Sequence, residues 1–185
     1  MNSPISIVVH SGHGHTLKIA EAIAAGSGGL LLPIDSQGEL PAQAWAQLDA
    51  SQAIVFGSPT YMANVSWQFK KFADASSAVW GRQGWKDKLA AGFTHSAGIN
   101  GDKLSTLHAL FSLSQQHGMI WAGTGMLPSN TKASMRDDTN YLASFAGLMA
   151  STPADASVDE MVPGDLKTAR LFGERIANIT RRHFN

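Results

Sequence analysis

The chain has 185 residues, of which 44% are hydrophobic and 15% charged, a composition typical of one soluble globular domain. Fourteen Lys and Arg balance fourteen Asp and Glu, and this zero net charge disfavours nucleic-acid binding. The absence of cysteine excludes disulfides and thiolate chemistry and fits a reducing compartment. Because the apolar run near the N-terminus is too short for a signal peptide or a membrane span, we expect a cytoplasmic protein without membrane insertion.

Strands and helices alternate along most of the sequence. Residues 5–10 form a continuous apolar and β-branched run, which predicts a strand buried on both faces of a parallel sheet. Similar reasoning predicts further strands over 30–34, 53–57, 89–95 and 119–122, and helices over 16–25, 41–48, 64–76, 102–116 and 166–179. Five strands alternating with helices predict a doubly wound α/β sheet with helices on both faces, in a single domain spanning residues 1–185.

The interval 123–163 interrupts this alternation. It is rich in Gly, Pro and Met, and we expect a long excursion with a short helix near residues 141–149. Long loops of this kind are usually functional or disordered, and the sequence leaves the role of this one open.

Three segments follow strand ends and should meet at one edge of the sheet: Ser11–Thr16, Ser58–Asn64 and Thr94–Gly101. They are rich in glycine and small hydrogen-bonding residues and contain no carboxylate. In the first segment, Gly12 and Gly14 allow several backbone N–H groups to point at one anion. The alternative is an ordinary strand-to-helix turn capped by a hydroxyl group.

Other phosphate, nucleophile and metal sites do not fit the sequence. The first loop lacks the Lys of a P-loop, and Leu17 stands where a dinucleotide fingerprint would need its third glycine. No G-x-S-x-G elbow occurs. His10, His13 and His15 have no acidic partner nearby, so we predict no metal site.

The motif SGHGHT after the first strand, together with FGSPTYMANVSWQFKKFAD over residues 56–74, resembles the flavodoxin-like FMN family. The nearest members are the tryptophan-repressor-binding-protein type of NAD(P)H:quinone oxidoreductases and the NADPH-dependent FMN reductases. The likeness covers about residues 5–122 and the terminal helix. It implies a flavodoxin-like five-stranded sheet with strand order 2-1-3-4-5.

The resemblance also implies roles for individual residues. Those expected around the FMN phosphate are Ser11, His13, Gly14, His15 and Thr16. Those expected at the edge of the isoalloxazine are Pro59, Thr60, Tyr61, Met62 and, also capping the next helix, Asn64. Those expected on its pyrimidine side are His95, Ser96, Ala97, Gly98 and Asn100. Trp80 and His117 would line a substrate pocket, partly from a neighbouring subunit.

The expected activity is two-electron transfer from NADPH or NADH through FMN to a quinone, a flavin or a similar small acceptor. His95, Tyr61 and His117 are the candidate catalytic residues, because each could donate a proton to a quinone oxygen. A homodimer or homotetramer is expected from the family. The alternatives are a flavodoxin-like electron carrier and an FMN-binding module that acts on a partner protein. The departure of the HSAGING loop from the glycine-rich family loop leaves quinone specificity open.

Overall fold

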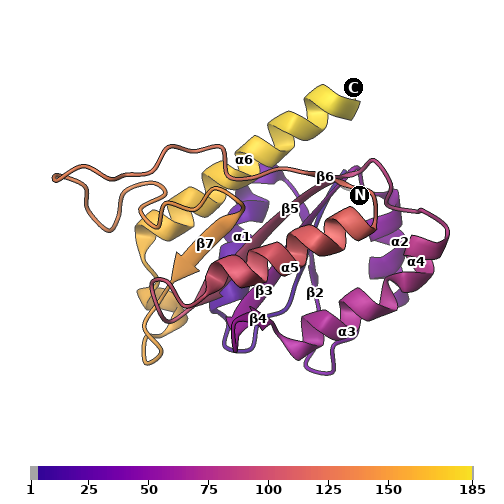
Figure 1. The fold of residues 1–185 in the computed structure, drawn as a ribbon, viewed down its shortest axis with the longest axis horizontal. Helices are drawn as coiled ribbons and strands as arrows, with labels where there is room; N and C mark the ends of the chain where they lie inside the picture. The colour runs from indigo at the N-terminus through magenta and orange to yellow at the C-terminus, as the bar shows by residue number, and fades with distance from the viewer. Residues whose placement is uncertain (1–3, 185) are drawn as a thin grey trace.

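A parallel sheet forms the centre of the molecule, and helices cover both of its faces (Figure 1). The computed structural model describes residues 4–184. The strands are β1 (Ile5–Val9), β2 (Leu30–Pro33), β3 (Ala53–Tyr61), β4 (Asn64–Val65), β5 (Leu89–Ser96), β6 (Ile120–Trp121) and β7 (Leu148–Ser151). The helices are α1 (His15–Ser27), α2 (Ala42–Ala50), α3 (Trp67–Ala75), α4 (Ser77–Gly81), α5 (Lys103–Gln116) and α6 (Pro163–Phe184).

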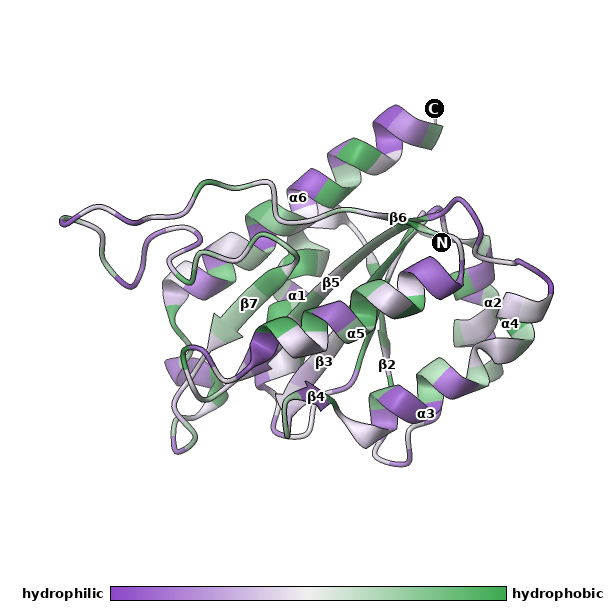
Figure 2. Ribbon diagram, in the orientation of Figure 1, coloured by the Kyte–Doolittle hydropathy of each residue, from purple (hydrophilic) through white to green (hydrophobic). Residues whose placement is uncertain are grey.

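The strand order is β2-β1-β3-β5-β6, and all four of these pairings are parallel. With the two-residue β4 set aside, this is the predicted order 2-1-3-4-5, so the flavodoxin-like fold is confirmed. Figure 2 shows that the central strands are mainly hydrophobic, whereas the helices also carry hydrophilic positions. That difference follows from burial, because the sheet is covered on both faces and each helix on one side only.

Alternation along the strands divides the core into two layers. Ile7 of β1 and Val55 of β3 pack with α1 and α6 on one face of the sheet. Their neighbours Val8 and Ile54 point the other way and pack with α2, α3 and α5. A strand buried on both faces needs apolar side chains in both directions, which is why these runs are continuous rather than alternating.

The fifth position of the sheet is occupied by two short strands, not by one. β6 pairs with the beginning of β5, and β7 pairs with its end, from Phe93 opposite Leu148 to Ser96 opposite Ser151. The excursion between them projects from the body of the molecule (Figure 1). The prediction of a short helix near residues 141–149 is therefore wrong. Leu, Met and Ala favour helices in isolation, but parallel pairing with β5 determines the conformation of residues 148–151.

A buried ion pair holds the end of β7 against the start of α6. Arg136, from the excursion, donates to both carboxylate oxygens of Asp165 at 2.7 and 2.6 Å. The same carboxylate accepts from the backbone N–H of Ser151 at 2.9 Å, and Arg136 also donates to the Ser151 carbonyl. These contacts fix the point from which the chain leaves the sheet. Within the described residues, no helix has the length and apolar character needed to cross a membrane.

Candidate functional site

A cavity of about 660 Å³ lies at the carboxyl ends of β1, β3 and β5. This is the edge of a parallel α/β sheet at which ligands usually bind. The loops after β1, β5 and β7 contribute to it together with the ends of β3 and β5, and we call it the groove. Its lining residues are Ser11, His13, His15, Thr16, Pro59, Thr60, Tyr61, His95, Ser96, Ala97, Thr152, Pro153, Ala154, Ala156, Ser157 and Val158.

The loop after β1 brings its backbone close to two neighbouring side chains. A Cβ atom added at Gly12 would lie 2.4 Å from the hydroxyl oxygen of Tyr61. Gly14 has a φ of 90° and precedes α1, and a Cβ there would lie 2.8 Å from a methyl carbon of Val158. The hydroxyl of Ser11 accepts from the Gly14 N–H at 3.1 Å. This curled loop at a helix N-terminus can present several donors to an anion.

The end of β3 is fixed by a buried cluster of three threonine hydroxyls. Thr60 is 2.8 Å from the Thr94 hydroxyl and 2.8 Å from the Thr106 hydroxyl. The Thr60 side chain is thus used internally and is not free for a ligand. Beside it, Tyr61 is 40% exposed, and its partial burial raises the pKa of the phenol. Tyr61 is therefore a hydrogen-bond donor at neutral pH.

The two residues that follow Tyr61, Met62 and Ala63, form a strained reverse turn. Met62 and Ala63 have φ values of 48° and 61°, the left-handed region that L residues rarely occupy. Both positive values match a two-residue hairpin turn, which joins β3 to the antiparallel β4. The side chain of Asn64 accepts from the next backbone N–H, and Ser66 is the residue that caps α3, accepting from the Phe69 N–H. The prediction that Asn64 caps this helix is wrong, because Asn64 belongs to the hairpin.

Two histidines stack across the groove. The rings of His15 and His95 are 5.1 Å apart and nearly parallel. His15 also contacts the carbonyl of Ala156 at 3.0 Å, which links the start of α1 to the loop after β7. Burial lowers the pKa of His95 to about 4, helped by His15 and Lys103, so its imidazole is neutral at pH 7. Its Nε2 is buried with no hydrogen-bond partner among the described residues.

The wall formed by residues 152–158 was not predicted from the sequence. It follows β7, so a sequence interpretation that missed this strand also missed its loop. The available signal was the short apolar run Leu148–Ala150, followed three residues later by Pro153, in a segment that has to return to the sheet before α6. Ser151 connects this wall to the loop after β5 by donating to the Ala97 carbonyl at 3.0 Å.

The groove fits the FMN predicted from the resemblance. Its lining contains no Lys, Arg, Asp or Glu, and it presents hydroxyls and curled backbone at one end. A side chain at Gly12 or Gly14 would crowd the lining residues Tyr61 or Val158, and the buried Nε2 of His95 has no hydrogen-bond partner within residues 4–184. A volume of this order is usual for cofactor sites. The described residues contain no group of three His, Asp or Glu that could hold a metal ion.

Some predicted site residues lie outside the groove lining. Gly14 forms the turn itself, whereas Met62 is 98% exposed and is not part of the cavity lining. Gly98 and Asn100 belong to the loop after β5 but do not line the cavity. Their assignment to the cofactor stays a prediction.

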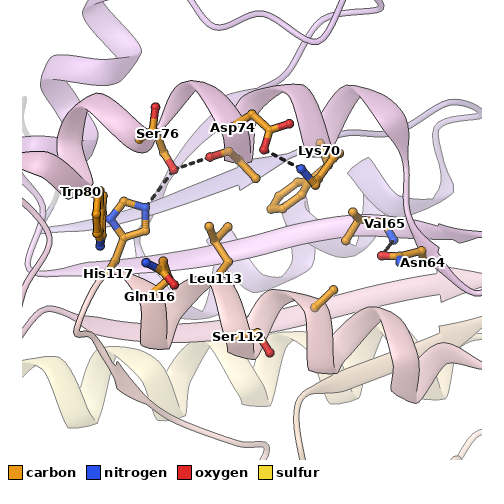
Figure 3. A pocket seen from close by; sticks show the side chains of 14 residues that line it. Asn64, Val65, Lys70, Asp74, Ser76, Trp80, Ser112, Leu113, Gln116 and His117 are labelled. Atoms are coloured by element: carbon orange, nitrogen blue, oxygen red, sulfur yellow. Dashed lines mark hydrogen bonds and ion pairs between the residues drawn. The ribbon is translucent and has the colours of Figure 1, made fainter.

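Trp80 and His117 lie together in a second cavity, of about 460 Å³, between α3 and α5 (Figure 3). Asn64 lies at its opposite end. His117 accepts or donates one hydrogen bond with the Ser76 hydroxyl at 2.8 Å and packs against Trp85. It follows the 14-residue α5, which spans about 21 Å and begins at the groove. Within one chain, His117 is too far away to act in the groove, and its role in a substrate pocket stays a prediction.

The comparison with known proteins agrees with the fold. The chain belongs to the family of NADPH-dependent FMN reductases, whose model matches residues 14–133. The flavodoxin FldP of Pseudomonas aeruginosa (strain UCBPP-PA14) is 47% identical over 173 residues, covering 94% of each protein. The solved structure of a flavodoxin, WrbA-like protein from Agrobacterium tumefaciens is 46% identical, with a TM-score of 0.81, and the match covers 97% of this chain and 98% of that one.

More distant relatives carry an enzyme name. An NAD(P)H dehydrogenase (quinone) of Geotalea uraniireducens is 28% identical over 204 residues, covering 96% of this chain and 98% of that protein. FMN and NADPH, the predicted cofactor and co-substrate, both appear in the name of the family to which this chain belongs, so the cofactor prediction is confirmed at that level. The relatives of this chain thus include proteins named as enzymes and proteins named as flavodoxins.

Proposed function

We propose that this protein is an FMN-dependent NAD(P)H oxidoreductase that reduces a quinone, a flavin or a similar small acceptor. The observation that carries the proposal is the groove itself, neutral and rich in donors, at the carboxyl edge of the sheet. FMN, when bound, supplies the redox chemistry by accepting two electrons from NAD(P)H and passing them to the acceptor. The residues of this chain bind the phosphate, orient the ring and transfer protons.

Binding of the phosphate is assigned to the loop after β1. Ser11 and Thr16 offer hydroxyls, and the backbone around Gly12 and Gly14 offers N–H groups at the N-terminus of α1. A helix N-terminus stabilises a phosphate through its dipole and its free donors. The absence of a carboxylate from the lining removes the repulsion that such a ligand would otherwise meet.

Orientation of the ring and transfer of protons are assigned to the loops after β3 and β5. The threonine cluster around Thr60 keeps the backbone of Pro59–Tyr61 in one position. Tyr61, protonated at neutral pH, is the proposed donor to an acceptor oxygen. Because His95 is neutral, it can contribute a hydrogen bond from its imidazole but not a positive charge.

The test is anaerobic mixing of the yellow protein with NADPH and, separately, NADH. Rapid bleaching near 450 nm, followed by return of the colour on adding benzoquinone, supports the enzyme. No bleaching over minutes contradicts it. A colourless protein that does not take up FMN contradicts the cofactor assignment as well.

The second candidate is an electron carrier that docks on a partner protein. It is favoured by the name of the 47% identical relative, a flavodoxin, and by exposed apolar side chains beside the groove, Met62 and Ile99 among them. Such a protein would bind FMN but would not be reduced directly by NAD(P)H. We retain a homodimer or homotetramer and a cytoplasmic location as predictions, to be tested by light scattering and by cell fractionation.

A further inference from the structure

A lysine is completely buried behind the groove. Lys103 is 0% exposed at the first residue of α5, and its ammonium group donates to the Ser96 hydroxyl at 2.9 Å and to the Gly98 carbonyl. Ser96 lines the groove, so the ammonium is one side chain removed from it. The proposed function leaves this group without a role.

The position of Lys103 is unfavourable for a cation. It lies in the first turn of a helix, where the helix dipole favours negative charge. Lys88, a partly buried lysine at the other end of β5, shows the opposite arrangement: its ammonium donates to the carbonyls of Leu48 and Ser51 at the C-terminal end of α2, where a cation is favoured. The charge of Lys88 is stabilised by the end of α2, whereas the charge of Lys103 is not stabilised by the dipole of α5.

No ion pair within residues 4–184 compensates the charge of Lys103. The nearest acidic group that acts on it, Asp165, is engaged at both oxygens by Arg136. Burial lowers the pKa of Lys103 to about 8, with Asp165 raising it and Arg136 lowering it. Its positive charge also acts on His95 across the end of β5. The groove lining contains no Lys or Arg, and this ammonium lies directly behind it, hydrogen-bonded to the lining residue Ser96.

The loop around Lys103 is shaped to hold it. Gly101 and Asp102 both have a positive φ, which folds the chain back so that the carbonyl of Gly98 reaches the ammonium. The hydroxyl of Ser96 contacts the same carbonyl at 3.3 Å. A neutral side chain of similar length could fill this space, but it could not carry a charge toward the groove.

We infer that Lys103 is a positioning residue that stabilises the reduced, negatively charged form of the bound flavin through the loop Ser96–Gly98, and so raises its reduction potential. This inference rests on the proposed function, because it requires FMN in the groove with its ring beside this loop. A cation in a poorly solvated position acts strongly on a new negative charge nearby, since little water screens the two. Lys103 would then balance the negative charge that reduction adds.

The test compares Lys103→Met with Lys103→Gln and with wild type, using reference dyes to measure the midpoint potential of bound FMN. Both variants should bind reduced FMN about tenfold more weakly relative to oxidised FMN, which corresponds to about 30 mV for a two-electron couple. Lys86→Met is the matched control. Lys86 is exposed and precedes β5 at the far end of the sheet, and its loss changes the net charge equally.

Three results would overturn the inference. The potential of Lys103→Met could equal that of wild type, or the control could show the same fall. Alternatively, Lys103→Gln could keep the wild-type potential, which would assign the effect to hydrogen bonding rather than to charge.

A titration of wild type alone covers the case in which neither Lys103 variant folds. The potential should fall more steeply as the pH rises through the pKa of Lys103, and lack of this added slope would also refute the inference. Failure of FMN uptake or of bleaching by NAD(P)H, measured on the same samples, would instead count against the proposed function.

Discussion

The groove and the cavity between α3 and α5 are of comparable size but differ in origin. The groove is assembled from the ends of four strands and the loops beyond them, and its lining contains no Lys, Arg, Asp or Glu. The cavity lies between two helices of one face and includes the exposed ion pair of Lys70 and Asp74. The difference teaches that a hollow alone does not select a candidate site, whereas the carboxyl edge of a parallel sheet, where distant segments meet, is the usual position for a ligand.

The largest effect that separates the two regions should come from pH. Because the pKa of His95 is about 4 when folded and near 6.5 when unfolded, the folded state binds this proton more weakly. Stability is then kept above pH 6.5 and lost as the pH falls toward 4, by about 3 kcal/mol. Urea denaturation at pH 7 and pH 4.5 should show a much smaller difference for His95→Gln. The exposed His108→Gln is the control, and an unchanged pH dependence in His95→Gln would refute the argument.

The next effect concerns FMN affinity. The double variant Ser11→Ala/Thr16→Ala should weaken binding by about 2 kcal/mol, roughly 30-fold in Kd, because two hydroxyls near a charged phosphate are lost. Fluorescence titration of FMN measures the change. Ser77→Ala/Ser112→Ala, which removes two hydroxyls from the cavity between α3 and α5, should leave Kd unchanged. Equal weakening in both double variants would show that the comparison between the regions is false.

The histidine of the second cavity should matter for stability rather than for the cofactor. His117→Ala removes the hydrogen bond to Ser76 and the packing on Trp85, so we expect a loss of about 1–2 kcal/mol in the free energy of unfolding. The Kd of FMN should stay within twofold in the monomer. If the KM for a quinone rises in the oligomer while Kd does not, His117 reaches the groove of a neighbouring copy.

The smallest effect should appear at the turn beside the groove. Ala63→Gly relieves a left-handed conformation that costs an L residue about 1–2 kcal/mol, offset by the greater chain entropy of glycine, for a net gain of about 0.5 kcal/mol. Thermal unfolding is the measurement. Ala50→Gly, in the last turn of α2, should have the opposite sign. A loss of stability in Ala63→Gly would mean that the turn is not strained.

Most of the fold could be predicted from the sequence, and the parts that could not depend on distant contacts. The runs around Ile7 and Ile54 reveal buried parallel strands because two covered faces require continuous apolar residues. β7 has no such signature, and only its pairing with the end of β5 makes it a strand. The site divides in the same way: local loop chemistry indicates Ser11–Thr16, whereas Lys103 lies within the helix predicted over 102–116 without any feature that singles it out. Nothing in its neighbours shows that the ammonium is enclosed.

The split in the fifth strand has a consequence for how the chain can be cut. β6 and β7 each pair with β5 by themselves, and Arg136 anchors the returning segment to Asp165. A break within residues 129–134 would therefore leave both flanks attached to the body, and exposed loop tips of this kind tolerate nicks and insertions. We expect the two fragments on either side of such a break to stay associated. Of the segments that build the groove, only the loop after β7 would come from the second fragment, together with α6.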